Sequence, residues 1–488
     1  MGIVIKQSLK NLIITYAGFV VGAVNTLFLY THFLSDEYYG LVGYLFSAAN
    51  IMMPLMAFGV HNTMVKFFSY YKNEEERQKF VTTVVFLPLL VIIPIGLIGL
   101  FGYQMITELL SEKNPIVDGY VWTIFVIAFT LAYFEIFYSW TRVHMKTVYG
   151  NFLKEVYPRV IASILLILVY FKILDFDGFV VAFTLSYVLR LFLMMISAVL
   201  IKRPRFNLGL PSNFNSVFRY GIVMILAGSV SVILLDIDKV MIGNYKEIEN
   251  VAYYSVAVYI AIVIAVPSRA LLQITTPMTS ELMNNRNYKE LLDLYRKSSL
   301  NLFIVGGLIF LLIMLNIHEL YEMIPESYKG GLLVVFLIAV AKLSDNLTGI
   351  NNAILFNSDF YRMVLMFGIF LAVITVVLNM IFIPIWGIYG AAFATMLSFL
   401  SYNALKLWYV HFKMKMQPFT RATLWIGLLI CGMFPLFYFW DFPWHPLLNI
   451  ILKSALISLI YIFVVYYFGI SEELKGLADR YLQKKGPR

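Results

Sequence analysis

The sequence is poor in cysteine and in charge. Its 488 residues contain a single cysteine, Cys431 in an apolar run, so no internal disulfide can form and no cysteine metal centre is indicated. Charged residues make up 13% of the chain and hydrophobic residues 61%. Soluble domains, by contrast, carry about 25% charged residues. With a mean hydropathy of +0.80, this composition excludes a soluble globular protein and predicts an all-α polytopic membrane protein.

Catalytic signatures are also lacking. The sequence has no phosphate-binding glycine loop, no His-x-x-x-His pair and no Gly-x-Ser-x-Gly turn. The connections between apolar runs are too short to hold the donor and the acids of a membrane glycosyltransferase. We therefore expect a protein that is not an enzyme, with no cofactor and no metal site. A membrane glycan polymerase or transferase is the least favoured alternative.

Apolar runs recur along the chain, with the length of about 20 residues that crosses a bilayer as a helix. The first run follows Lys10 and no small-residue cleavage site comes after it, so we expect an uncleaved first span. We expect fourteen transmembrane helices, at 9–33, 40–70, 80–107, 117–142, 152–172, 178–201, 214–242, 250–282, 295–316, 331–356, 361–384, 387–412, 420–440 and 446–469.

Lysine and arginine lie mainly in every second connection. Such cations gather on the cytoplasmic side of membrane proteins, whereas acidic residues contribute little to orientation. We therefore interpret the net charge of +9 as a sign of topology, with both termini cytoplasmic, and not as affinity for nucleic acid. The basic connections contain Lys66, Lys72, Arg142, Lys146, Lys154, Lys202, Arg203, Arg205, Arg286, Lys289, Arg362, Lys406, Lys413 and Arg421.

The chain contains a weak internal repeat. A shift of 213 residues aligns Pro54 with Pro267 and Asn25 with Asp238. We expect two pseudo-symmetric six-helix lobes, 1–201 and 214–413, a basic cytoplasmic linker at 202–213, and a final segment, 414–488, with two extra helices and a basic cytoplasmic tail. Six is an even number, so both lobes enter the membrane from the same side, as in a parallel repeat.

The linker combines a basic run with proline and glycine, in the sequence Lys-Arg-Pro-Arg-Phe-Asn-Leu-Gly-Leu-Pro-Ser-Asn. The favoured interpretation is a solvated cytoplasmic connection that obeys the charge rule. The alternative is a segment that lies along anionic lipid headgroups.

One predicted span carries an arginine within its apolar run. A charge at the bilayer centre costs about 2.5–3.5 kcal/mol on insertion scales, so Arg269 requires a partner, water or a ligand. Helical spacing places Gln273 on the same face. Because a guanidinium suits phosphate oxygens and stays charged when buried, we expect Arg269 and Gln273 to face a substrate. A structural ion pair is the alternative.

Other polar residues within the predicted spans are candidates for substrate, ion or hinge roles. Asn25 and Asp238 lie on faces of small residues, which indicates either a cavity or close helix packing. Lys342 and Asp345 are three residues apart and would neutralise each other, or bind substrate and a coupling ion respectively. Glu135 is a second ion-coupling candidate, and pairing with Arg190 is its favoured interpretation. Pro54 and Pro267 are the expected hinges of a gate.

Several short motifs resemble a known family. Asp238-Lys-Val-Met-Ile-Gly243 with Val251-Ala-Tyr-Tyr-Ser-Val-Ala257 is similar to the signature of polysaccharide-unit flippases around the seventh and eighth helices. Tyr38-Tyr-Gly-Leu41 and Gly387-Ile-Tyr-Gly-Ala-Ala392 are further matches. With the pattern of six, six and two helices, the chain resembles the multidrug/oligosaccharidyl-lipid/polysaccharide (MOP) exporter superfamily, in its O-antigen flippase branch.

The resemblance implies a flippase of the bacterial inner membrane. Its substrate would be an oligosaccharide linked to undecaprenyl pyrophosphate, moved from the inner to the outer leaflet by alternating access. It further implies a proton or sodium counter-ion, polysaccharide assembly proteins as partners, and a monomer. A lipid II flippase is the closer alternative. A cation-coupled multidrug exporter is the other, because Asp236, Asp238 and Asp345 offset the cations Arg269 and Lys342.

Overall fold

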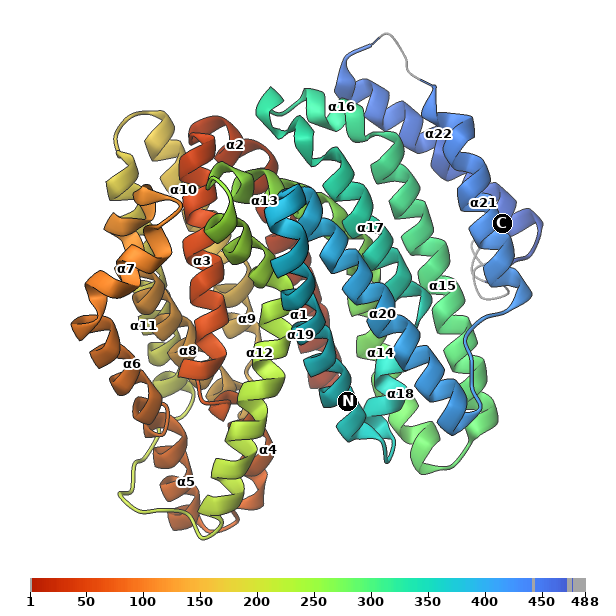
Figure 1. Cartoon of the computed structure of the whole chain (residues 1–488). Coiled ribbons are helices and arrows are strands. Elements are labelled where there is room, and N and C mark those ends of the chain that lie inside the picture. Colours follow the sequence, from red (N-terminus) through yellow and green to blue (C-terminus); the bar gives the residue numbers. More distant parts are fainter. Residues whose placement is uncertain (1, 441–443, 472–475, 477–488) are drawn as a thin grey trace, which may run out of the picture. The chain divides into compact units, whose positions relative to one another are not determined.

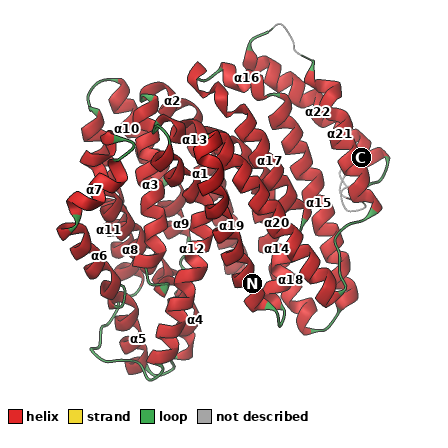
Figure 2. Cartoon of the chain, in the orientation of Figure 1, coloured by secondary structure: helices red, strands yellow, loops and turns green. Residues whose placement is uncertain are grey.

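The computed structural model describes residues 2–440, 444–471 and 476, and these residues form helices and connecting turns without a strand (Figure 2). An apolar chain folds this way because a helix satisfies its backbone hydrogen bonds internally where no water is available. The expected all-α class is therefore confirmed for the described part of the chain. The chain divides into two compact units. The first consists of Met1–Ser255 and Asn379–Ala391, and the second of Val256–Leu378 and Ala392–Arg488.

The first unit contains most of the N-terminal helices, coloured from red to green in Figure 1. Within it α3 packs against α8 and α12, and α8 packs against α11. Its elements are α1 Gly2–Val24, the π-helical turn η1 Asn25–Leu29, α2 Tyr30–Phe33, α3 Asp36–Met56, α4 Val60–Phe67, η2 Phe68–Tyr70, α5 Glu74–Phe86, α6 Leu89–Phe101, α7 Tyr103–Ser111, η3 Pro115–Tyr120, α8 Val121–Val143, α9 Val148–Glu155, α10 Tyr157–Tyr170, α11 Phe176–Ile201 and α12 Phe214–Tyr245.

The second unit contains the remaining helices, and α13, α19 and α20 contribute residues to both units. Within the second unit α15 packs against α14, α17 and α21. The elements after α12 are α13 Glu249–Ile262, η4 Val263–Ala265, α14 Val266–Asn284, α15 Tyr288–Leu315, α16 Ile317–Glu322, η5 Glu326–Gly331, α17 Leu332–Leu347, α18 Asn351–Asn357, α19 Tyr361–Trp386, α20 Ile388–Met414, α21 Arg421–Tyr438 and α22 Pro446–Tyr467.

Twelve helices in the described part of the chain are long and apolar enough to cross a membrane. The fourteen expected spans are not confirmed as a count. The predicted span 152–172 is interrupted at Val156, and its longer piece, α10, has 14 residues. That is less than the about 20 residues a span requires. The predicted lobes at 1–201 and 214–413 also stay a prediction, since the contacts place α12 in the first unit.

Several predicted spans are broken helices. The chain turns at 57–59 between α3 and α4, where Phe58 and Gly59 have φ angles of 50° and 62°. Glycine is required at position 59, since an added Cβ would lie 2.6 Å from the carbonyl oxygen of Gly221. Pro54 lies just before this turn, and Pro267 lies in the first turn of α14 after the 3-10 turn η4. Both expected hinge prolines therefore adjoin a break.

Candidate functional site

A charged pair joins two helices inside the first unit. Nζ of Lys154, in α9, lies 2.5 Å from Oε1 of Glu135, in α8. The side chain of Glu135 is 12% exposed and that of Lys154 is 41% exposed. The expected ion pair between Glu135 and Arg190 is therefore wrong. Lys154 takes that place because α9 follows α8 after a short turn and both helices pack against α11.

Arg190 lies near this pair and has no hydrogen-bond partner among the described residues. It belongs to α11, is 5% exposed, and its guanidinium lies 3.8 Å from the ring centroid of Phe134 and 5.5 Å from that of Tyr187. Its Nε has no hydrogen-bond partner among the described residues. Aromatic faces stabilise a guanidinium but do not neutralise its charge. Arg190 thus remains a buried cation.

Together with His61 of α4, these residues form what we term the Glu135 cluster: Glu135, Lys154, Arg190 and His61. Glu135 interacts electrostatically with each of the other three. The cluster contains one carboxylate, the guanidinium of Arg190 and the ammonium group of Lys154, so positive groups outnumber negative ones before His61 is counted. Chemically, it attracts an anion.

Asn25 lies in the π-helical turn η1 and connects α1 to α10. Its Nδ2 donates to the carbonyl oxygen of Arg159 (2.7 Å), and Ser163 Oγ donates to its Oδ1 (2.6 Å). Asn25 is 3% exposed, and both of its polar atoms have partners. These contacts give Asn25 a role in helix packing, and its contact with a substrate stays a prediction.

The carboxylate of Asp238 is likewise held by the first unit. The hydroxyl of Tyr254 donates to one of its oxygens, and Asn379 Nδ2 donates to the other at 2.7 Å. Its side chain thus ties α12 to α13 and α19. No sequence signal identified Tyr254 and Asn379 as partners, since Asn379 lies 141 positions away in the chain.

The carboxylate of Asp236 likewise has donors, from side chains of α3 and α12. Ser47 Oγ donates to one oxygen at 2.8 Å, and Asn50 Nδ2 donates to the other at 3.1 Å. Nζ of Lys239 lies 3.4 Å from the first oxygen. These three donors explain how an aspartate persists in an otherwise apolar helix.

The second unit contains a comparable pair. Nζ of Lys406, in α20, lies 3.8 Å from Oδ1 of Asp345, in α17, and 3.1 Å from Oδ1 of Asn352. Lys406 is 1% exposed, although the charge pattern predicted a place in a cytoplasmic connection. Position 406 also falls within the expected helix 387–412, and in the structure Lys406 lies inside α20, where its Nζ contacts Asn352 and Asp345. Lys342 is also buried, with Nζ 4.0 Å from the ring centroid of Phe399.

Arg269 is exposed on α14, two residues after Pro267. It forms no ion pair and no hydrogen bond with the described residues of the second unit. A structural pair within that unit, the alternative to a ligand, is therefore absent for Arg269. The side chain of Gln273 lies outside the described residues, so its expected place beside Arg269 stays a prediction.

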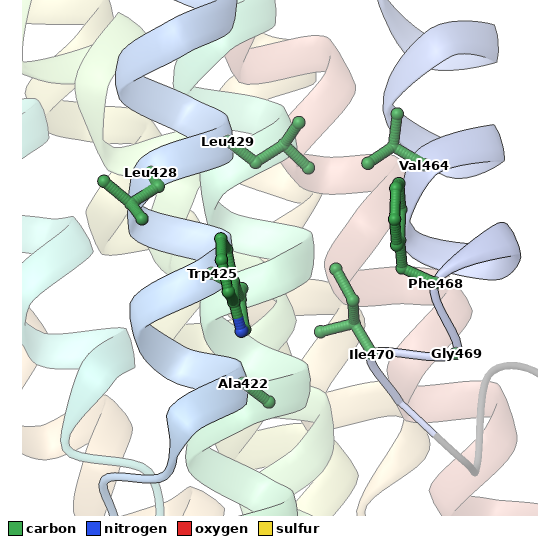
Figure 3. A pocket seen from close by; sticks show the side chains of 8 residues that line it. All are labelled: Ala422, Trp425, Leu428, Leu429, Val464, Phe468, Gly469 and Ile470. Carbon is green, nitrogen blue, oxygen red and sulfur yellow. The ribbon is translucent and has the colours of Figure 1, made fainter.

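A pocket of about 670 Å³ lies between α21 and the end of α22. Figure 3 shows side chains from α21, among them Trp425 and Leu428, on one side, and Val464 and Phe468 on the other. None of the described residues that line the pocket is charged. It suits hydrocarbon, so it does not compete with the Glu135 cluster as a site for a charged ligand.

Comparisons with known proteins agree with this architecture. A family model described as "Polysaccharide biosynthesis protein" matches residues 4–283, which include the Glu135 cluster and Arg269. A search of curated protein sequences gives no match.

Solved structures of two kinds are similar. The lipid II flippase MurJ, in an inward closed conformation, is 15% identical with a TM-score of 0.74, over 94% of this chain and 99% of that one. An inward-facing multidrug resistance MATE family transporter of the MOP superfamily is 14% identical with a TM-score of 0.60, over 85% and 95%. The MATE transporter VcmN of Vibrio cholerae is 12% identical with a TM-score of 0.56, over 85% and 98%. At such identities these structures establish a shared fold.

Proposed function

Because the chain belongs to the polysaccharide biosynthesis protein family, within the MOP exporter superfamily, we propose that it is a lipid-linked oligosaccharide flippase. Its substrate would be a glycan of the O-antigen, capsule or exopolysaccharide type, attached to undecaprenyl pyrophosphate. The protein would carry this substrate from the inner to the outer leaflet of the bacterial inner membrane. The family description, which names polysaccharide biosynthesis, supports this substrate over lipid II and over drugs.

The observation that carries the proposal is the positive excess of the Glu135 cluster. Arg190 is buried without a hydrogen-bond partner among the described residues, and Lys154 forms its ion pair with Glu135. An uncompensated cation inside a membrane protein is costly, so a substrate that brings negative charge stabilises it. A diphosphate supplies that charge and oxygen atoms that accept hydrogen bonds from ammonium and guanidinium groups.

Lys154 would act on the diphosphate in the first unit. Its side chain is 41% exposed and can reach a ligand, whereas Arg190 is buried and would contribute only the electrostatic attraction of its charge. Arg269, exposed on α14 in the second unit, stays a predicted substrate contact in its own right. Asn25 and Asp238 would support the site by holding helices together, through the hydrogen bonds described above.

Alternating access would use the broken helices. The breaks beside Pro54 and Pro267 leave fewer backbone hydrogen bonds to lose when a helix bends. Glu135 and Asp345 are the candidates for coupling to protons or sodium, since each is a carboxylate shared with one lysine. A counter-ion that binds either carboxylate would release that lysine for the substrate.

Native mass spectrometry of the purified protein tests the substrate class. We expect a bound polyprenyl-linked glycan in the wild type and a reduced amount in Lys154→Gln and Arg269→Gln. Lys329→Gln is the matched control, because Lys329 is an exposed cation that pairs with Glu326 in η5. Bound lipid II, or efflux of cationic dyes without any bound glycolipid, would replace the proposed substrate by one of the two alternatives.

A further inference from the structure

The connection between α11 and α12, residues 202–213, lies along α5 and the end of α8 as a fixed segment. Four hydrogen bonds hold it, written from donor to acceptor: Trp140 Nε1 to Lys202 O (2.9 Å), Asn207 N to Thr82 Oγ1 (2.8 Å), Ser212 N to Glu76 Oε2 (2.8 Å), and the Tyr71 hydroxyl to Asn213 Oδ1. The favoured expectation of a solvated connection is therefore incomplete, because the segment has a defined place on the first unit.

A basic pocket of about 990 Å³ lies between this segment and α5. Its walls are the face of α5 that carries Glu74, Arg77 and Gln78, the ring of Trp140, and residues 202–206. Arg77 forms an ion pair with Glu74, which is the one carboxylate in the lining. The exposed cations Lys202, Arg203 and Arg205 remain in excess.

Three large apolar side chains next to this pocket are exposed. Phe206 is 52% exposed, Leu208 95% and Leu210 65%. They lie between α11 and α12, outside any helix, so they are not part of the lipid-facing surface of a span. An apolar patch of this kind beside cations is typical of a segment at a membrane surface.

The position of residues 202–213 along α5 also fits a segment at the membrane surface. The sequence of α5 changes from mostly charged at 74–79 to uncharged and largely apolar at 80–86. The backbone N–H of Asn207 donates to Thr82 Oγ1. Gly209 lies against the side chain of Lys79, so that a Cβ added at position 209 would lie 3.3 Å from it. Leu208 therefore lies beside the level at which α5 passes from water into the apolar layer.

We propose that residues 202–210, together with the face of α5 described above, form a docking site for anionic phospholipid of the inner leaflet. The phosphodiester of a lipid such as phosphatidylglycerol occupies the basic pocket, where Lys202, Arg203 and Arg205 neutralise it. Phe206, Leu208 and Leu210 enter the adjacent acyl region. This site is separate from the proposed transport site, and the lipid it binds is a resident lipid.

Lipid retention by the full-length protein tests the charge part of the site. The probe is phosphatidylglycerol, with phosphatidylcholine as the neutral comparison, measured by native mass spectrometry. We expect Arg203→Gln with Arg205→Gln to weaken phosphatidylglycerol binding about tenfold or more, because each cation contributes at the surface of an anionic membrane. The control is Lys413→Gln with Lys415→Gln, two exposed cations at the end of α20, which should retain the lipid. Equal retention by both double variants would overturn the proposal.

A labelling experiment tests the apolar part independently. Cys431 is the single cysteine, so Cys431→Ser with Leu208→Cys gives one site for an environment-sensitive fluorophore. In phosphatidylglycerol vesicles we expect quenching by lipids that carry a nitroxide near the headgroup, and weaker quenching with the label at Lys413→Cys. An unquenched label, or displacement of phosphatidylglycerol by millimolar inorganic phosphate, would contradict membrane docking and assign the pocket to a soluble anion.

Discussion

Nζ of Lys154 lies 2.5 Å from Oε1 of Glu135, and this ion pair links α9 to α8 near Arg190, whose Nε has no hydrogen-bond partner among the described residues. In the second unit, Asp345 pairs with Lys406. Glu135 and Asp345 are separated by 210 residues, which is close to the spacing of the internal repeat. Each unit thus contains one carboxylate in a corresponding part of the chain, shared with a lysine from a neighbouring helix.

The Glu135 and Lys154 side chains should affect substrate binding in opposite directions. Glu135→Gln removes the carboxylate that competes for the lysine, so we expect tighter binding of a polyprenyl diphosphate and slower release during transport. Lys154→Gln removes the ligand contact and should weaken binding about tenfold, the order of one charge-assisted hydrogen bond. Titration of purified protein with the lipid measures both. A change of the same sign in the two variants would show that the pair acts only on helix packing.

The turn between α3 and α4 depends on Gly59. Its φ angle is 62°, and an added Cβ would lie 2.6 Å from the carbonyl oxygen of Gly221 in α12. We expect Gly59→Ala to destabilise the protein by about 1–3 kcal/mol, which thermal unfolding in detergent would measure. Gly427→Ala is the control, because no heavy atom lies within 4 Å of its added Cβ in α21. There alanine should stabilise the helix by up to about 1 kcal/mol.

Asn346 stabilises the break between α13 and α14. Asn346 belongs to α17, and its Nδ2 donates to the carbonyl oxygen of Ile264 at 2.8 Å. On the way its side chain passes against Gly306 of α15. Asn346→Leu should cost about 1 kcal/mol and speed hydrogen exchange at 264–270, since that carbonyl loses its donor. Ser398→Ala, which removes a hydrogen bond within α20, should leave exchange at 264–270 unchanged. Unchanged exchange in both variants would contradict this role.

A second buried ion pair should control stability without affecting substrate selection. Nζ of Lys453 in α22 lies 3.2 Å from Oε1 of Glu319 in α16, and their side chains are 2% and 7% exposed. Lys453→Met alone leaves a buried carboxylate and should destabilise the second unit by about 3–5 kcal/mol.

The double variant Lys453→Met with Glu319→Gln should recover most of that loss, because no buried charge remains. The exposed pair of Lys297 and Asp293 is the control, and Lys297→Met should change stability by less than about 1 kcal/mol. Additive losses from Lys453→Met and Glu319→Gln would mean that the two side chains act separately.

Composition and hydrophobic run length predicted the helical membrane class, and the repeat aligned Pro54 with Pro267, each of which adjoins a helix break. The partners of the buried charges could not be predicted. Glu319 and Lys453 are 134 positions apart, and helix packing alone brings them together. The burial of Lys406 could not be predicted for a related reason: the rule that assigns basic residues to the cytoplasm does not reveal which of them pack inside a helical unit.

The Glu135 cluster is proposed to serve the translocation of a lipid-linked oligosaccharide. The most direct measurement is the rate at which the purified protein, reconstituted in vesicles, moves a fluorescent undecaprenyl-pyrophosphate oligosaccharide between leaflets, with lipid II and a cationic dye tested alongside. We predict translocation of the oligosaccharide by the wild type and by Lys329→Gln, and a loss of at least about tenfold in Lys154→Gln. Wild-type rates in Lys154→Gln, or faster transport of lipid II or the dye than of the oligosaccharide, would contradict the account.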